Sequence, residues 1–304
     1  MVRFFYIYKK RVIRILKLFI RAALWLFCAE INTKNKYLLN TDGPLLIIAN
    51  HPNSFLDAII IGSRYNRRIH FLARGDVFTK KHHRFLLSLL NMIPVYRLRE
   101  GKEFLHLNEY AFKESVRLLN KKEAVLIFIE GTCLNTNQLQ PFKKGTARIL
   151  EACHAENSFP QIHLAGIAYN NFKGIGKKVN LCLSVFIQKT AIINAKDRVE
   201  FNQHVFKQLS NLIIPNTKTT IIKKTALYYF HRPFYYLVYQ FVQNKTKGTV
   251  FFDSVLFGVL FFLYPIYLFI IIVILQIISI PQPIIFGTLG LLFLFRNQTL
   301  DANE

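Results

Sequence analysis

Acidic side chains are scarce in this chain of 304 residues, which contains 17 Asp and Glu against 40 Lys and Arg. The formal net charge of +23 favours an anionic partner, either nucleic acid or a negatively charged membrane surface. Between residues 254 and 295 the sequence has no Asp, Glu, Lys or Arg. A protein that only binds nucleic acid has no need of such an apolar stretch. The composition therefore favours membrane lipids as partners, with no nucleic acid.

Cysteine is rare as well, and the four residues Cys28, Cys133, Cys153 and Cys182 form no C-x-x-C pair. This spacing predicts neither a disulfide framework nor a thiolate zinc site, and reduced thiols in a cytosolic compartment are expected. The sequence also lacks a Walker pattern, a dinucleotide-binding glycine pattern and the G-x-S-x-G of a hydrolase nucleophile. We therefore expect no bound metal ion and no cofactor.

Residues 1–38 are predicted to be an amphipathic helical segment at a membrane interface. Lys10, Arg14, Lys17 and Arg21 recur at spacings of four, three and four, so they share one helical face. Another face carries apolar side chains, which are Ile13, Leu16, Ile20, Leu24 and Phe27. A basic face opposite an apolar face suits the headgroup region of an anionic bilayer. The alternative is a helix packed on the globular domain, with its lysines in solvent.

Residues 39–215 alternate between short β-branched runs and helical patterns. This predicts an α/β domain with a mostly parallel sheet and helices on both faces. The run at 45–49 is apolar on both faces, as a covered strand requires. The predicted strands are 45–49, 69–73, 93–97, 124–129, 162–168 and 179–186, and the predicted helices are 56–65, 79–91, 103–121, 144–156 and 196–213.

The C-terminal part of the chain carries two further membrane signals. Residues 216–250 are rich in Tyr and Lys, which suits an interfacial helix, although the same mixture can stack on single-stranded nucleic acid. Residues 251–304 are predicted to form a transmembrane helical hairpin, broken by Pro281 and Pro283. The second half, 283–295, is short enough to be re-entrant instead. The basic residues before the hairpin predict that the globular domain lies on the cytoplasmic face of the membrane.

One histidine and one aspartate stand where a parallel sheet places its chemistry. His51 follows the predicted strand 45–49, and Asp57 lies in the first turn of the next helix, which Asn53 or Ser54 could cap. Asp57 can then orient the His51 imidazole and stabilise its cation while the other ring nitrogen accepts a proton. Taken alone, such a pair is more often a surface histidine beside a solvated aspartate.

The sequence NHPNSFLD at 50–57 resembles the first motif of the glycerolipid acyltransferases, the family of 1-acylglycerol-3-phosphate (lysophosphatidic acid) O-acyltransferases. Three further motifs follow in the family's order, and the resemblance extends over about residues 40–195. They are FLARGDVF at 71–78 with IPVYR at 93–97, FIEGT at 128–132 with PFKKG at 141–145, and LAGIA at 164–168.

The resemblance implies an enzyme of phospholipid biosynthesis that moves a fatty acyl group from acyl-CoA or acyl carrier protein to a hydroxyl of a lysophospholipid, with 1-acylglycerol-3-phosphate as the expected acceptor. His51 would act as the general base and Asp57 would orient it, without a covalent acyl-enzyme. The residues implied in holding the acceptor are Asn53, Ser54, Arg97, Glu130, Gly131, Thr132, Lys143 and Lys144.

Three departures from the family pattern leave the acceptor open. Five residues rather than four separate His51 from Asp57, so the turn must bulge to restore their contact; some glycerol-3-phosphate acyltransferases look similar here. Cys133 replaces an arginine of the third motif, and Lys143, Lys144 or Arg148 could supply the missing charge. The fourth motif lacks its usual proline. Glycerol-3-phosphate or a lyso-aminolipid remains an alternative acceptor, and a non-catalytic lipid-binding scaffold remains an alternative function.

Overall fold

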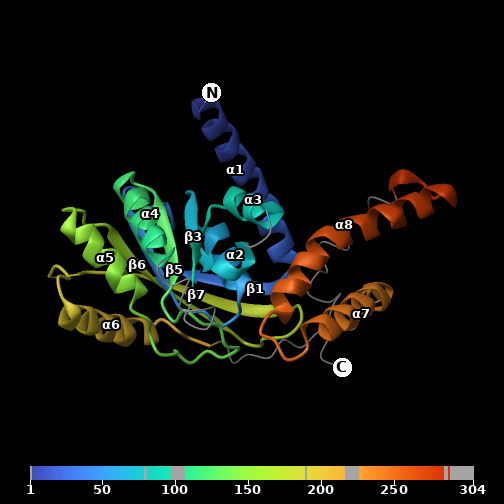
Figure 1. The fold of residues 1–304 in the computed structure, drawn as a ribbon. Coiled ribbons are helices and arrows are strands. Elements are labelled where there is room, and N and C mark those ends of the chain that lie inside the picture. The colour runs from blue at the N-terminus through green and yellow to red at the C-terminus, as the bar shows by residue number, and fades with distance from the viewer. Residues whose placement is uncertain are drawn as a thin grey trace.

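A seven-stranded sheet forms the centre of the computed structural model, which describes residues 2–78, 81–96, 107–188, 190–215, 226–283 and 287. The strand order is β1-β7-β6-β2-β5-β3-β4 (Figure 1). Every neighbouring pair is parallel except β6 and β7, which are antiparallel. The strands are β1 (Cys28–Lys34), β2 (Leu45–Ala49), β3 (Ile69–Arg74), β4 (Met92–Val95), β5 (Ala124–Phe128), β6 (Gln161–Tyr169) and β7 (Lys177–Phe186).

Helices cover both faces of this sheet, and strand β2 shows why. All five of its residues are fully buried, and their side chains alternate between two apolar clusters. Leu45, Ile47 and Ala49 pack with α1, α2, α7 and α8, while Leu46 and Ile48 pack with α4, α5 and α6. The helices are α1 (Val2–Phe27), α2 (Phe55–Arg64), α3 (Lys81–Leu89), α4 (Asn108–Asn120), α5 (Gly145–Ala155), α6 (Ala195–Ser210), α7 (Ala226–Thr246) and α8 (Phe252–Ile277), with the 3-10 turns η1 (Lys36–Asn40) and η2 (Gly75–Phe78). The predicted α/β class with a mostly parallel sheet is confirmed.

The N-terminal segment differs from the prediction that residues 1–38 are helical. Helix α1 ends at Phe27, and Cys28–Lys34 is an edge strand parallel to β7. The strand escaped prediction because it contains Ala, Glu, Asn, Thr and Lys rather than a β-branched apolar run.

Two of the basic residues on α1 contact the domain instead of facing outward. Lys17 Nζ donates hydrogen bonds to the carbonyls of Tyr65 and Arg67, and Arg21 Nε donates to the carbonyl of Ser63. These carbonyls lie at or just past the C-terminal end of α2, where a helix presents unpaired oxygens and partial negative charge. Burial, followed by the charge of Arg21, lowers the pKa of Lys17 to about 8.

The expectation that Lys17 and Arg21 face a bilayer is therefore wrong, and the packed alternative holds for this half of α1. Beside the exposed Arg14, the outward face of α1 carries large apolar side chains. These are Val12, Ile15, Leu18, Phe19 and Trp25.

Helix α8 projects away from the sheet domain and is long and apolar enough to cross a membrane, by length and composition (Figure 1). None of its most apolar window is buried within the protein. Its first turns are different, because Phe252, Asp253, Leu256 and Phe257 are buried against the domain. The predicted hairpin is thus represented by its first helix, while the second half, 283–295, falls outside the described residues apart from residues 283 and 287.

Candidate active site

The loop between β2 and α2 lies at the carboxyl end of the central strand and is tied to both neighbouring strands. Asn50 exchanges two hydrogen bonds with the backbone of Ile167 in β6, at 2.9 and 2.8 Å. The backbone N–H of His51 donates to Glu130 Oε2 at 2.9 Å, just beyond β5. These bonds fix the position of the His51 main chain.

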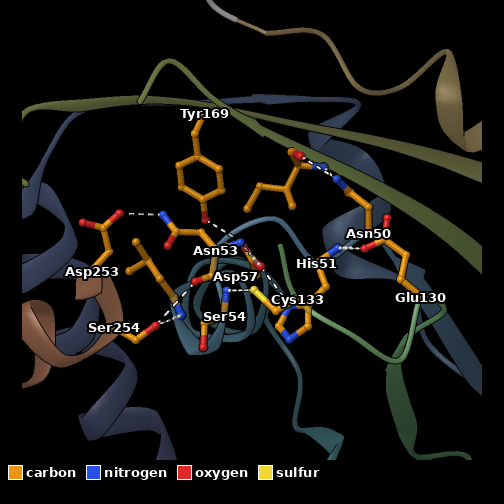
Figure 2. A network of polar contacts seen from close by, with 12 residues as sticks. Asn50, His51, Asn53, Ser54, Asp57, Glu130, Cys133, Tyr169, Asp253 and Ser254 are labelled. Atoms are coloured by element: carbon orange, nitrogen blue, oxygen red, sulfur yellow. Dashed lines mark hydrogen bonds and ion pairs between the residues drawn. The ribbon is translucent and has the colours of Figure 1, made fainter. Parts of the chain in front are cut away.

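His51 and Asp57 are in contact, as predicted. His51 Nδ1 lies 2.9 Å from Asp57 Oδ2, and the Asp57 side chain is fully buried while that of His51 is 19% exposed (Figure 2). Asp57 Oδ2 also accepts the Asn53 backbone N–H at 2.8 Å, and Oδ1 accepts the Tyr169 hydroxyl at 2.7 Å. Burial, followed by the Asp57 charge, raises the pKa of Tyr169 well above its usual value, so the phenol stays protonated and donates.

The extra residue between His51 and Asp57 is accommodated by a bulge at Ser54, whose φ of 53° is unusual for a residue other than glycine. Ser54 occupies the capping position of α2 but its side chain makes no capping bond. The N–H groups here have other partners: Ser54 N donates to Cys133 Sγ at 2.9 Å, and Leu56 N donates to Ser254 Oγ at 3.1 Å. The prediction that Asn53 or Ser54 caps α2 with its side chain is wrong.

The second ring nitrogen of His51, Nε2, is open to a bound molecule. The imidazole stacks on Phe128 with ring centroids 3.8 Å apart and planes 13° from parallel. In the part of the chain that the structure describes, Nε2 of His51 has no hydrogen-bond partner. With Nδ1–H directed to Asp57, Nε2 carries the lone pair and can accept a proton from a bound molecule.

Glu130 has a different role from the one that its motif implies. It is only 2% exposed, and its two carboxylate oxygens accept backbone N–H groups from His51 and from Gln140, the latter at 3.0 Å. Burial raises the pKa of this carboxyl, while the two backbone bonds lower it. Glu130 therefore holds two loops together, and its contact with a substrate stays a prediction.

The other implied binding residues lie in three settings. Gly131, at φ +61°, and Thr132 form a half-buried turn, and the exposed Lys143 passes over it so closely that a Cβ on Gly131 would lie 2.8 Å from Lys143 Cγ. Lys144 is exposed but lines a separate cavity of about 490 Å³ beside α6. Asn53 and Ser54 are buried within the loop. Arg97 lies outside the described residues.

Cys133 occupies the place of the family's arginine without supplying its charge. Its sulfur accepts the Ser54 N–H, and burial, followed by the Asp57 charge, raises the pKa of its thiol to about 12. At neutral pH the thiol is therefore protonated and uncharged. No group of three or more His, Cys, Asp or Glu side chains within the described residues is placed to hold a metal ion.

Sequence reasoning missed three partners of this loop: Tyr169, Asp253 and Ser254. Tyr169 had a weak signal, since it directly follows the fourth motif at the end of strand β6. Asp253 had another, as the last acidic residue before the apolar run. Their contacts with residues 112 to 201 positions away could not be read from spacing.

His51 is held by a buried carboxylate on one side and open on the other, beyond a central parallel strand, which is an arrangement suited to general-base chemistry. Residues 30–170 match the family model described as Acyltransferase. This match supports the glycerolipid acyltransferase family that the ordered motifs predicted.

A solved structure is also similar to this chain: the crystal structure of the 1-acyl-sn-glycerophosphate (LPA) acyltransferase PlsC from Thermotoga maritima. The two share 17% sequence identity with a TM-score of 0.49, and the match covers 67% of this chain and 80% of the other. No curated protein matches the chain.

Proposed function

We propose that this acyltransferase moves a fatty acyl group from the thioester of acyl-CoA or acyl carrier protein to the free hydroxyl of 1-acylglycerol-3-phosphate, on the cytoplasmic face of a membrane. The observation that carries the proposal is the 2.9 Å contact between His51 Nδ1 and Asp57 Oδ2, which leaves Nε2 open. No cofactor is required, because the thioester itself supplies the activated acyl group.

The reaction follows from this geometry. Nε2 of His51 accepts the proton of the acceptor hydroxyl as the hydroxyl oxygen attacks the thioester carbonyl carbon. The imidazolium is stabilised by the Asp57 carboxylate, whose own charge is held by Tyr169 and the Asn53 N–H. The tetrahedral intermediate then expels the thiolate, which takes the proton from His51 and leaves as a thiol. The products are the diacyl lipid and the free carrier thiol, and His51 is restored.

The acceptor phosphate has a candidate position over the turn at Gly131 and Thr132. Lys143 crosses this turn and can bring an ammonium group to a phosphate there, in place of the missing charge at Cys133. A Gly-Thr turn also offers backbone N–H groups and a hydroxyl to the same anion. Arg97 is proposed as a further phosphate ligand from its motif alone.

A lyso-aminolipid is the second candidate acceptor, and the neutral thiol of Cys133 favours it. Where the family carries an arginine that pairs with phosphate oxygens, this chain presents an uncharged sulfur already engaged by Ser54. Transfer to lysophosphatidic acid, glycerol-3-phosphate and a lyso-aminolipid, measured side by side with one labelled acyl donor, separates the candidates.

The test of the general base is His51→Ala in full-length protein reconstituted in vesicles. A positioned base contributes about 10²–10⁴-fold, so kcat for acyl transfer should fall by at least about 100-fold. The exposed His204 on α6 offers the matched control, and His204→Ala should keep wild-type turnover. Near-normal turnover in His51→Ala would show that His51 is not the general base. Saturable lysolipid binding without turnover in the wild type, for every donor and acceptor, would favour the lipid-binding scaffold instead.

A further inference from the structure

The first turn of the apolar helix α8 reaches into the loop that carries His51. Asp253 Oδ2 accepts a hydrogen bond from Asn53 Nδ2 at 2.8 Å (Figure 2). Asp253 Oδ1 accepts the backbone N–H of Gly174 at 2.9 Å. The two residues of the first bond are 200 positions apart in the sequence. The C-terminal helix therefore contacts the loop directly rather than through the sheet.

Ser254, the next residue on α8, caps helix α2 from outside. Its Oγ accepts the Leu56 N–H at 3.1 Å and donates to the carbonyl of Asn53 at 3.4 Å. The first N–H groups of a helix have no partner within that helix and usually bond to a side chain of the preceding loop. Here the preceding loop supplies no capping side chain, and a hydroxyl from another helix takes that place.

The base of α8 is itself anchored by a buried ion pair. Lys177 Nζ in β7 lies 2.6 Å from Asp253 Oδ2, and both side chains are fully buried. Lys177 Nζ also donates to Asn171 Oδ1 at 2.8 Å. Separating such a pair would leave an uncompensated buried charge, which costs free energy. The pair with Lys177 therefore holds the Asp253 carboxylate in the position from which it bonds Asn53.

Asn53 transmits this position to the reacting group. Its side chain is held by Asp253, its carbonyl by Ser254, and its own N–H donates to Asp57 Oδ2, the oxygen that also contacts His51. The loop needs external support, because Ser54 adopts a positive φ that is unfavourable for serine. A shift of Asn53 would therefore move or release the carboxylate that orients the base.

We propose that Asp253 and Ser254 are positioning residues for the His51–Asp57 pair, so that the apolar helix α8 is part of the active site and not only an anchor. This inference rests on the proposed function, because the reaction that these two residues would affect is the proposed acyl transfer. It adds that the catalytic loop adopts its reactive geometry only while α8 is seated against the domain.

The first test is Ser254→Ala in the full chain, which removes one hydroxyl and no charge. Small displacements of catalytic groups cost up to about 100-fold, so we expect kcat to fall roughly 10-fold while both KM values stay within about 2-fold. Ser254→Thr keeps the hydroxyl and should restore most of kcat. Thr246→Ala is the matched control, because that buried hydroxyl bonds only within α7, and it should leave kcat unchanged.

The second test separates positioning from stability. Asp253→Leu combined with Lys177→Met replaces the buried ion pair with apolar side chains, an exchange that is often neutral or stabilising. The doubly substituted protein should keep its melting temperature in detergent yet lose kcat by about 10-fold or more, because Asn53 Nδ2 has lost its acceptor.

Hydrogen–deuterium exchange of the segment 50–58 gives a readout that needs no substrate. Ser254→Ala should speed exchange in this segment, and Thr246→Ala should not. Wild-type exchange and wild-type kcat in both Ser254→Ala and the double variant would overturn the positioning role. If the wild type transfers no acyl group to any acceptor, the proposed function fails, and the exchange experiment still decides whether α8 orders the loop.

Discussion

Two neighbouring lysines show how a single residue's surroundings decide its role. Lys143 and Lys144 are both exposed, but Lys143 crosses the Gly131 turn, whereas Lys144 faces a cavity beside α6. Lys143→Ala should raise KM for 1-acylglycerol-3-phosphate about 10-fold with little change in kcat, because a charge-assisted hydrogen bond is worth about 1.5–3 kcal/mol.

Lys144→Ala is the matched control, with the same charge removed one position away, and its KM should stay within about 2-fold of the wild type. Initial rates over a series of acceptor concentrations measure both variants. A larger effect on Lys144→Ala than on Lys143→Ala would move the phosphate site to the α6 side of the loop.

For single residues, the sequence predicted the contact between His51 and Asp57 and little of its support. Their place between a strand and a helix allowed this contact, the family motif made it expected, and the bulge followed from the extra residue. The role of Glu130 could not be predicted, because which donors its oxygens accept depends on how two loops fold around it. Tyr169 was missed for the same reason: its bond to Asp57 exists only once β6 lies beside β2.

Among the elements, strand β6 contains a buried histidine that makes stability depend on pH. His163 is fully buried, with its ring nitrogens 3.2 Å from the Tyr65 hydroxyl and 3.5 Å from Thr41 Oγ1. Burial, followed by the charge of Arg67, lowers the pKa of His163 to about 4 from an ordinary value of 6.5. Between these two values the unfolded chain binds more protons than the folded chain, so stability falls as the pH decreases.

The stability that depends on His163 should therefore be complete above about pH 6.5 and lost progressively toward pH 4, by about 3 kcal/mol in total. Denaturant unfolding in detergent at pH 7 and at pH 4.5 measures this loss. His163→Gln should show a shallower pH dependence than the wild type. If the free energy of unfolding of His163→Gln falls as steeply with decreasing pH as that of the wild type, groups other than His163 cause the loss of stability.

The elements also show where patterns in the sequence succeed. The apolar runs of β2, β5 and β6 were predicted to within a residue or two, because strands covered on both faces must be apolar along their length. Strand β1 lies at the sheet edge and was missed, since an edge strand needs only alternate burial. The orientation of α1 was wrong for a related reason: helical spacing defines a basic face but not which partner that face meets.

For the whole molecule, the outward apolar face of α1 predicts a contact with the bilayer that is separate from α8. Leu18 and Phe19 are 61% and 62% exposed, and Trp25 is the single tryptophan of the chain. Large exposed apolar side chains of this kind mark an interaction surface, and aromatic rings favour the lipid headgroup region. In vesicles, Trp25 fluorescence should be quenched by lipids brominated near the headgroup.

Leu18→Ser combined with Phe19→Ser should reduce this quenching by about half or more while the protein stays in the membrane fraction, because the apolar helix α8 is unchanged. The melting temperature should not change, since both side chains are exposed. If the Trp25 fluorescence intensity is the same in brominated and in unbrominated vesicles, this face of α1 does not contact the bilayer.

The bond between Asn53 and Asp253 has a consequence for the order in which the protein is made. A ribosome that adds about 5–20 residues per second takes roughly 10–40 s to proceed from one of these residues to the other. During that interval the nascent chain already contains His51 and Asp57, but not the helix whose first turn supports their loop. On the proposed role of Asp253 and Ser254, a newly synthesised molecule completes the loop of His51 last, once the apolar helix α8 has been made, and its activity would begin only then.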